Sequence, residues 1–330
     1  MILAGDIGGT KTVLALFEPR AGALVATAEE TFKSADFATL KDVVTAFRAK
    51  HPFERIDGAC FGVAGPVHEG KAKLTNLPWV LDEAQFIRDL GAPKVALLND
   101  LTAAAYGMLF LAPEEFHALQ GNSGLPKQGS IAVVAPGTGL GEAILYFDGQ
   151  RYHALPSEGG HTDFAPIDDT QIDLLRHLRK VVGGHISYER ILSGAGIGAA
   201  YDFCRLESKT PEPAWLTAER TGGDPNAAIT QAALAHTDPV CEKALGIFAT
   251  VLGAEAGNLA LKCLASTIIL GGGIPPKILP ALQDGAFTRG LGDKGRFAGW
   301  TGTLSVQVAL NPRAPLLGAA NYLSSDRIHR

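Results

Sequence analysis

The chain contains 330 residues, of which 46% are hydrophobic, and its formal net charge is −5 at pH 7. This length supports two lobes of ordinary domain size, each with its own apolar core. Acidic and basic residues are interspersed, so no basic face indicates a nucleic acid or an anionic lipid as partner, and a small molecule is the better expectation.

Cysteine usage and the amino terminus indicate the compartment. The four cysteines lie far apart, without a C-x-x-C pair or a neighbouring histidine cluster, which argues against a zinc site and a disulfide framework: Cys60, Cys204, Cys241 and Cys263. The chain enters a strand-like run at once, with no basic leader. Its longest apolar stretch, residues 103–112, is about half the roughly 20 residues that a membrane span needs. We therefore expect a cytoplasmic protein, neither exported nor embedded in a membrane.

The first hundred residues predict alternating strands and helices. Strands are expected at residues 2–6, 12–17, 23–32, 58–64 and 95–98. The first two flank a Gly-Gly turn and form a hairpin. Helices are expected at residues 38–50, 82–90 and 101–111. The first lobe is expected to end near residue 110.

The second part of the chain repeats this opening. After a polar stretch at 121–129, strands at 131–135 and 143–147 flank the turn Pro136-Gly137-Thr138-Gly139. The remainder is more helical, notably at 239–264, and later strands are expected at 266–270 and near 304–310. Two lobes that each open with a glycine-turned hairpin suggest an old duplication with a cleft between the copies. We predict a small α/β lobe of residues 1–110 plus about 312–330, and a large α/β lobe of residues 111–311.

Two glycine turns are candidate phosphate sites. In the run Gly5, Asp6, Ile7, Gly8, Gly9 and Thr10, a carboxylate ends a strand, and the glycines let backbone N–H groups approach phosphate oxygens. Asp6 would face a metal ion. A lone Gly-Gly pair is more often an ordinary hairpin turn, and the run is neither a Walker loop nor a dinucleotide motif.

The second turn, Gly137-Thr138-Gly139-Leu140-Gly141, supplies another set of N–H groups and the hydroxyl of Thr138. Two such turns at corresponding places of two lobes are much rarer by chance than one, because a triphosphate clamped across a cleft needs donors from both walls. The pair therefore predicts phosphate binding more strongly than either turn alone.

Polar residues elsewhere are candidates for binding a small polar ligand. Asn99 and Asp100 follow a buried strand, where a parallel sheet presents polar groups to a ligand, although Asp100 could instead cap the helix that starts at Leu101. Glu158 and His161 flank two glycines, so both side chains can converge on one small polar ligand; the alternative is a surface turn. Glu189 falls on an expected helix, where most glutamates are simply solvated.

Taken together, in this order, these segments resemble the bacterial glucokinases of the hexokinase, actin and chaperone ATPase superfamily along nearly the whole chain. Further matching stretches lie at residues 163–166, 189–194 and 293–297. The resemblance implies an α/β, two-lobed, actin-like (ribonuclease H-like) ATPase fold with a central cleft. It also implies ATP-dependent phosphorylation of D-glucose at the 6-hydroxyl, giving glucose 6-phosphate and ADP and feeding glycolysis.

The resemblance also implies roles for single residues. Asp100 would be the catalytic base. Residues holding the sugar hydroxyls, together with Asp100, would be Asn99, Glu158, His161 and Glu189. Residues of the ATP site would be Gly5, Asp6, Ile7, Gly8, Gly9, Thr10, Gly137, Thr138 and Gly139, with Gly271 and Gly272 on the adenosine side, although a plain strand-to-helix turn explains the last two almost as well. Asp6 would position Mg²⁺ through water, and the family implies a homodimer.

The opening motif also resembles a second large group of sugar kinases, which includes sugar-responsive repressors. That group usually carries a cysteine-rich zinc motif, whereas residues 163–172 contain no cysteine, and no helix-turn-helix domain precedes the opening strand. A kinase of another hexose or of an N-acetylated amino sugar stays open, because selectivity depends on loop shape around Glu158 and Glu189. So does a non-catalytic sugar sensor on the same fold, against which the retention of Asp100 beside Asn99 speaks.

Overall fold

The computed structural model describes residues 1–20, 22–74, 77–126 and 128–323. The chain divides into two compact units. The first contains Met1–Ala112, Phe147–Pro156 and the segment from Asn311, and the second contains Pro113–Tyr146 and Ser157–Leu310. The assignment of residues 147–156 to the first unit differs from the boundaries that the sequence suggests.

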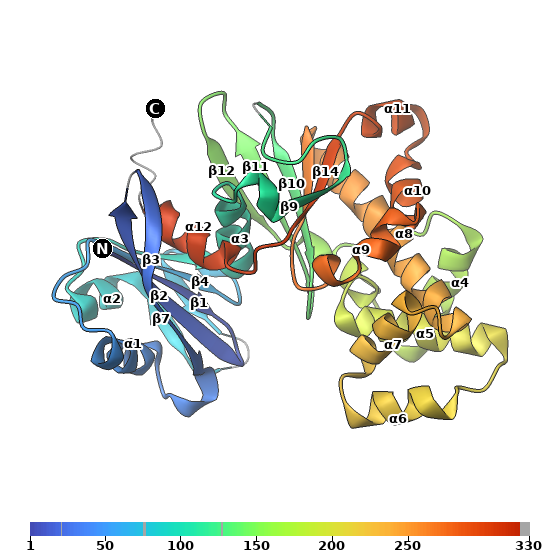
Figure 1. Ribbon diagram of the computed structural model, residues 1–330, viewed down its shortest axis with the longest axis horizontal. Coiled ribbons are helices and arrows are strands. Elements are labelled where there is room, and N and C mark those ends of the chain that lie inside the picture. Colours follow the sequence, from blue (N-terminus) through green and yellow to red (C-terminus); the bar gives the residue numbers. More distant parts are fainter. Residues whose placement is uncertain (21, 75–76, 127, 324–330) are drawn as a thin grey trace. The chain divides into compact units, whose positions relative to one another are not determined.

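The first unit is built on a five-stranded sheet (Figure 1). In sheet order its strands are β3 (Ala23–Lys33), β2 (Lys11–Arg20), β1 (Ile2–Ile7), β4 (Gly58–Val63) and β8 (Val95–Asn99). Strands β1, β4 and β8 run parallel, and β1 and β2 form the expected hairpin, in which Ile7 is opposite Thr12. A small second sheet joins β5 (Val67–His68), β6 (Lys71–Lys73) and β7 (Val80–Asp82).

Helices cover both faces of the five-stranded sheet, because the side chains of each strand point alternately to one face and to the other. Leu3 and Ile7 of β1 belong to a core shared with α1 (Leu40–Lys50) and α2 (Glu83–Leu90). Ala4 belongs to the opposite core, shared with α3 (Asp100–Met108) and α12 (Ala314–Tyr322). By the same alternation, Asp6 is on the face of the sheet that α3 covers.

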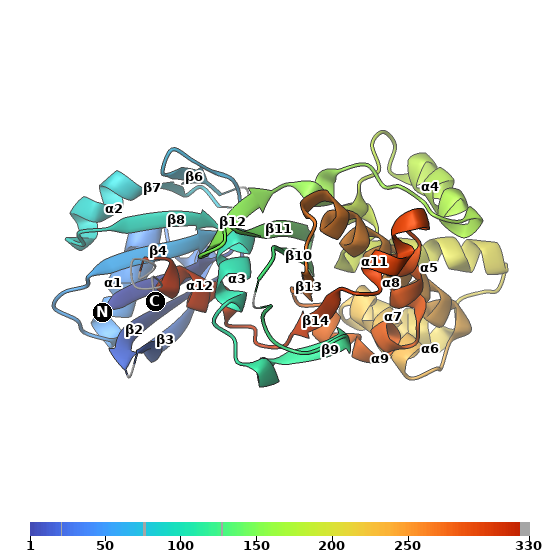
Figure 2. The same ribbon diagram turned by 90° about the horizontal axis from the view of Figure 1, so that it is seen from above.

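Helices α3 and α12 lie side by side (Figures 1 and 2) because glycines let their backbones touch. A Cβ atom on Gly107 would lie 1.8 Å from the carbonyl oxygen of Ala314, and one on Gly318 would lie 1.8 Å from that of Ala103. The C-terminal helix is therefore locked onto α3, whose first residue is Asp100.

The third sheet has six strands. In order they are β12 (Tyr152–Ser157), β11 (Leu140–Phe147), β10 (Ile131–Pro136), β13 (Thr267–Leu270), β14 (Ser305–Ala309) and β9 (Phe116–Gln120). The predicted hairpin is β10–β11, in which Pro136 is opposite Leu140, and β10, β13 and β14 run parallel. Both glycine-turned hairpins that the sequence predicts are thus confirmed.

The helices of the second unit gather around α8 (Pro239–Cys263). The others are α4 (Asp169–Val181), α5 (Gly194–Ser208), α6 (Ala214–Gly222), α7 (Pro225–Leu234), α9 (Leu279–Gln283), α10 (Ala286–Gly292) and α11 (Ala298–Thr301). Helix α8 is long and apolar enough to cross a membrane, but 78% of its most apolar window is buried inside the protein. It is therefore a core helix of this unit.

The mixed α/β fold with two units confirms the predicted fold class. One local prediction is wrong. Glu189 is not on an α-helix but in η4 (Tyr188–Arg190), a single 3₁₀ turn, because the next helix, α5, has its own N-cap at Ser193. Strands β5, β6, β7, β9 and β12 were not expected from the sequence.

Candidate active site

The carboxyl ends of the parallel strands in the first unit bring together Asp6, Asn99 and Asp100. Strand β1 pairs with β4, and β4 pairs with β8, so that Ile7, Val63 and Asn99 are in register. Asp6 precedes Ile7, and Asp100 follows Asn99. Burial raises the pKa of Asp6 to about 6, and the negative charge of Asp100 adds to this effect.

Hydrogen bonds within the first unit fix the first glycine turn. The Gly8 N–H donates to the Lys11 carbonyl at 3.0 Å, and the Ser34 hydroxyl donates to the Gly8 carbonyl at 2.8 Å. Ser34 also lies 3.0 Å from the buried Thr12 hydroxyl. These bonds fix the loop next to Asp6, where it could contact a phosphate group.

Asn99 caps α3, and Asp100 is the first residue of that helix. The Asn99 side-chain oxygen accepts hydrogen bonds from the N–H groups of Leu101 at 3.0 Å and Thr102 at 3.2 Å. The N-cap of α3 is therefore Asn99, and the alternative in which Asp100 is the cap is wrong. One Asp100 oxygen accepts from the Leu101 N–H at 2.8 Å.

Glycine 62 lets α3 approach the sheet. A Cβ atom at this position would lie 3.0 Å from the Ala103 Cβ and 3.7 Å from the Asp100 Cα. The absence of a side chain on β4 thus fixes where the helix begins. It keeps Asp100 close to the strand that separates it from Asp6.

In the second unit, two glycine turns lie against each other. The Gly137 N–H donates to the Gly139 carbonyl at 2.8 Å, and the Gly194 N–H donates to the Gly137 carbonyl at 2.9 Å. Gly272 has a φ of 79°, and a Cβ atom on it would lie 2.4 Å from the Pro136 carbonyl oxygen. The structure therefore places the two predicted nucleotide turns, 137–139 and 271–273, next to each other. Thr138 is exposed on the first of these turns.

The N-terminus of α5 adds a group that the sequence reasoning did not assign. Ser193 is its N-cap, accepting from the Gly196 N–H at 3.1 Å, and Gly194 binds the 137–139 turn directly. The signal was available, because a serine followed by small residues is a typical helix start.

Glu158, His161 and Glu189 converge within the second unit. The His161 ring nitrogens lie 4.0 Å from a Glu158 oxygen and 4.0 Å from a Glu189 oxygen. The Glu158 side chain is 71% exposed and the His161 side chain 60% exposed, so both are available to a ligand. Two carboxylates and an imidazole in this arrangement offer several acceptors and one or two donors, which suits the hydroxyls of a sugar.

Glu189 also connects this cluster to the glycine turn. Its Oε2 atom accepts from the Leu140 N–H at 3.0 Å, and a Cβ atom on Gly139 would lie 2.4 Å from the same oxygen. Glycine at 139 is therefore required for Glu189 to reach its place.

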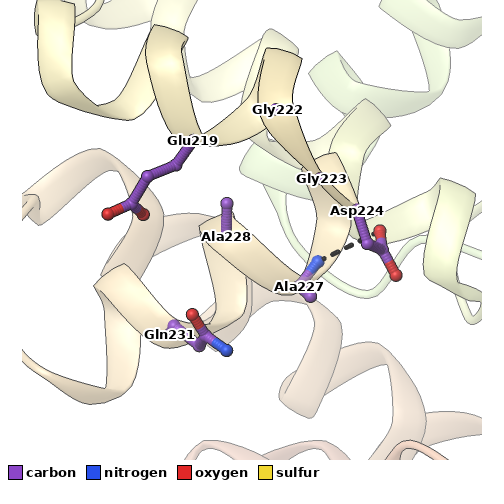
Figure 3. Close-up of a pocket in the computed structure, with 7 residues that line it drawn as sticks. All are labelled: Glu219, Gly222, Gly223, Asp224, Ala227, Ala228 and Gln231. Carbon is purple, nitrogen blue, oxygen red and sulfur yellow. Dashed lines mark hydrogen bonds between the residues drawn. The ribbon is translucent and has the colours of Figure 1, made fainter.

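A pocket lies between the end of α6 and the start of α7 (Figure 3). Its lining residues are Glu219, Gly222, Gly223, Asp224, Ala227, Ala228 and Gln231. Asp224 is occupied as the N-cap of α7, accepting from the N–H groups of Asn226 and Ala227. None of the residues predicted to bind sugar or nucleotide lines it.

Comparison with known proteins identifies the family. The family model described as Glucokinase matches residues 3–326. A glucokinase from Nostoc punctiforme is 41% identical, over 97% of this chain and 98% of its own length. The chain belongs to the glucokinase family.

Solved structures agree with this membership. The glucokinase-family chain superposes on the crystal structure of a glucokinase from an Antarctic psychrotroph with a TM-score of 0.86, at 31% identity and 98% coverage of each chain. A ROK family glucokinase from Streptomyces griseus, in complex with glucose and AMPPNP, is 22% identical, with a TM-score of 0.64 and coverage of 97% of this chain and 98% of its own. The latter likeness shows the fold alone.

Proposed function

We propose that this glucokinase-family chain transfers the γ-phosphoryl group of ATP to the 6-hydroxyl of D-glucose, giving glucose 6-phosphate and ADP for glycolysis. The observation that carries the proposal is the 41% identity to a glucokinase over nearly the full length of both chains. The clusters around Asp100 in one unit and around His161 in the other supply the groups that such a transfer requires.

On the sugar side, Glu158, His161 and Glu189 hold ring hydroxyls, since carboxylates accept and an imidazole N–H donates. Asn99 contributes its amide, although its oxygen is shared with the cap of α3 and its nitrogen lies 3.3 Å from the Gly65 carbonyl. Asp100 accepts the proton of the 6-hydroxyl as that oxygen attacks the γ-phosphorus. A carboxylate at the first turn of a helix, close to a second carboxylate, is well placed as such a base.

On the nucleotide side, the backbone N–H groups of the two glycine turns hold the phosphates of ATP. These are residues 5–10 of the first unit and 137–139 of the second. The turn containing Gly271 and Gly272 takes the adenosine side, because it lies directly against Pro136 and Gly137.

The residues around Asp6 fit a magnesium ion. Two neighbouring carboxylates, one with its pKa raised to about 6 by burial and by the other, are relieved by a divalent cation. The described residues contain no group of three or more His, Cys, Asp or Glu side chains able to hold a metal. Asp6 would hold Mg²⁺ through water, and the bound ion would neutralise phosphate charge.

A coupled assay tests the function. Purified protein with ATP and Mg²⁺ is expected to form glucose 6-phosphate, with a higher kcat/KM for glucose than for mannose or N-acetylmannosamine. A preference for the amino sugar would overturn the substrate assignment, and glucose binding without turnover would favour the sugar sensor. We also propose a cytoplasmic homodimer, and light scattering that shows a monomer would contradict the dimer.

A further inference from the structure

A buried pair of carboxylates lies beneath the turns that carry Glu158 and Glu189. Glu142 is on β11 and is 1% exposed, and Glu255 is on α8 and is fully buried. Within the described residues, neither Glu142 oxygen receives a hydrogen bond from a donor group, and neither does Glu255 Oε1. The two carboxyl groups are close enough for the charge of Glu255 to raise the pKa of Glu142. Two buried carboxyl groups can hydrogen-bond to each other only when one of them carries a proton.

The surrounding charges are consistent with one shared proton. Burial raises the pKa of Glu142 to about 8, and the charge of Glu255 adds to this, whereas Lys262 acts in the opposite direction. Lys262 Nζ lies 3.6 Å from Glu255 Oε1. Lys294 also faces Glu255. Burial lowers the pKa of this lysine, and the negative charge of Glu255 partly offsets that effect by raising it. With Glu142 neutral, these lysines face a single buried negative charge, which they compensate.

The pair contacts both sugar-side turns. A Cβ atom on Gly159, between Glu158 and His161, would lie 2.0 Å from Glu142 Oε2, so the carboxyl group is packed against that backbone. On the other side, Asn258 Nδ2 donates to Glu255 Oε2 at 2.9 Å and to the Tyr188 hydroxyl oxygen at 3.0 Å. The pKa of Tyr188 is raised by burial and by Glu255, so its hydroxyl stays neutral. Tyr188 directly precedes Glu189 in η4.

We propose that Glu142 and Glu255 share one proton, and that this pair is the support that positions Glu158, His161 and Glu189 for the sugar. The proposal rests on the function proposed above. Glu142 and Glu255 are positioning residues, because neither reaches the ligand. Loss of the proton places a second negative charge beneath the turns and displaces them. Sugar affinity is therefore expected to fall at alkaline pH.

The test is the pH profile of the glucose KM in wild type and in Glu142→Gln, which keeps the shape and a donor toward Glu255 but does not ionise. In wild type, the glucose KM should rise roughly 3- to 30-fold between pH 7 and pH 9.5, as expected for loss of one proton, with smaller changes in the ATP KM. Glu142→Gln should keep the neutral-pH KM within about twofold and lose the alkaline rise. The exposed Glu207→Gln on α5 is the matched control and should keep the wild-type profile.

Glu255→Gln is the second variant. It removes the charge that helps to hold the proton on Glu142, so the midpoint of the alkaline rise should move to lower pH. A flat wild-type profile, or an alkaline rise unchanged in Glu142→Gln, would overturn the proposal.

Thermal unfolding separates this proposal from the proposed function, because it needs no substrate. The folded protein holds a proton that the unfolded chain releases at lower pH, so the contribution of Glu142 to stability falls as pH rises toward 8. Glu142→Gln should therefore gain in Tm relative to wild type between pH 5 and pH 9. Parallel Tm curves would overturn the shared proton. Failure to phosphorylate glucose at pH 7 would instead overturn the proposed function, and the pair would then be judged on the unfolding curves.

Discussion

Each of the two glycine-turned hairpins carries a carboxylate next to its turn, and the surroundings of the two carboxylates differ. In the first unit, Asp6 lies just before its turn, is partly buried, and neighbours Asp100. In the second unit, Glu142 lies just after its turn, is fully buried, and neighbours Glu255. Both pairs raise the pKa of one member, to about 6 and about 8, respectively. The difference between the two pairs is their burial. The partly buried pair, Asp6 and Asp100, can bind a cation and a substrate, whereas the fully buried pair, Glu142 and Glu255, can bind only a proton.

The largest effect is expected for Asp100→Asn, which removes the base of the partly buried pair but keeps its shape. Turnover should fall by roughly 10² to 10⁴, whereas glucose affinity should change far less because the other sugar contacts stay. Stability should not fall, because Asn99 is the cap of α3 and the charge repulsion on Asp6 is relieved.

Steady-state kinetics and a melting curve check both parts. A folded Asp100→Asn protein that keeps near wild-type kcat would show that the mechanism is wrong, whatever its melting temperature.

Asp6→Asn should separate stability from function at the same pair. Because the folded-state pKa of about 6 exceeds the ordinary 3.8, the folded protein binds this proton more tightly than the unfolded chain. Stability is therefore lost as pH rises from about 4 to about 6. Without ligands at pH 7, the variant should be more stable by up to about 3 kcal/mol and much less active.

Denaturant unfolding of wild type and Asp6→Asn at pH 4 and pH 7 measures this difference. The gain should be present at pH 7 and nearly absent at pH 4. A gain that is equal at both values would show that ionisation of Asp6 is not its cause.

Glu158→Gln tests the exposed side of the second cluster. It exchanges a charged acceptor for a neutral group of nearly the same shape, so glucose binding should weaken by about 1 to 3 kcal/mol and ATP binding by less. Calorimetry with each ligand measures both effects. Equal glucose affinity in variant and wild type would reduce Glu158 to a residue of a surface turn.

The sequence predicted the hairpins well, because Gly-Gly turns between alternating apolar residues depend on local chemistry. It placed the start of α3 one residue late, since Asn99 and Asp100 are both good caps and only the structure distinguishes them. Glu189 was expected on a helix because the new start at Ser193 was not taken as a boundary.

Glu142 was missed entirely. A charged residue in an alternating strand is usually on the solvent side, and its burial depends on Glu255, which lies more than 100 positions away on α8. Long-range packing of this kind has no local signal. The same holds for the contact between Glu189 and Gly139.

The smallest effect is expected for a pair of glycine substitutions that compares neighbouring positions of one turn. Gly139→Ala places a Cβ atom 2.4 Å from Glu189 Oε2, so the carboxylate must move and its bond to the Leu140 N–H must weaken. Gly137→Ala meets its nearest neighbour, the Gly273 nitrogen, at 3.9 Å, which is ordinary contact. Gly139→Ala should therefore raise the glucose KM by roughly 5- to 20-fold, the equivalent of about 1 to 2 kcal/mol.

Gly137→Ala should change the glucose KM by less than about twofold, because the backbone N–H and carbonyl groups of residue 137 stay in place. Its effect should appear in the ATP KM instead, because the added methyl group leaves less space for a phosphate group at the turn. Kinetics of both variants with each substrate varied in turn provides the comparison. If the two substitutions raise the glucose KM equally, the glycine turn acts as one flexible loop, and Glu189 is not held by the space that Gly139 leaves.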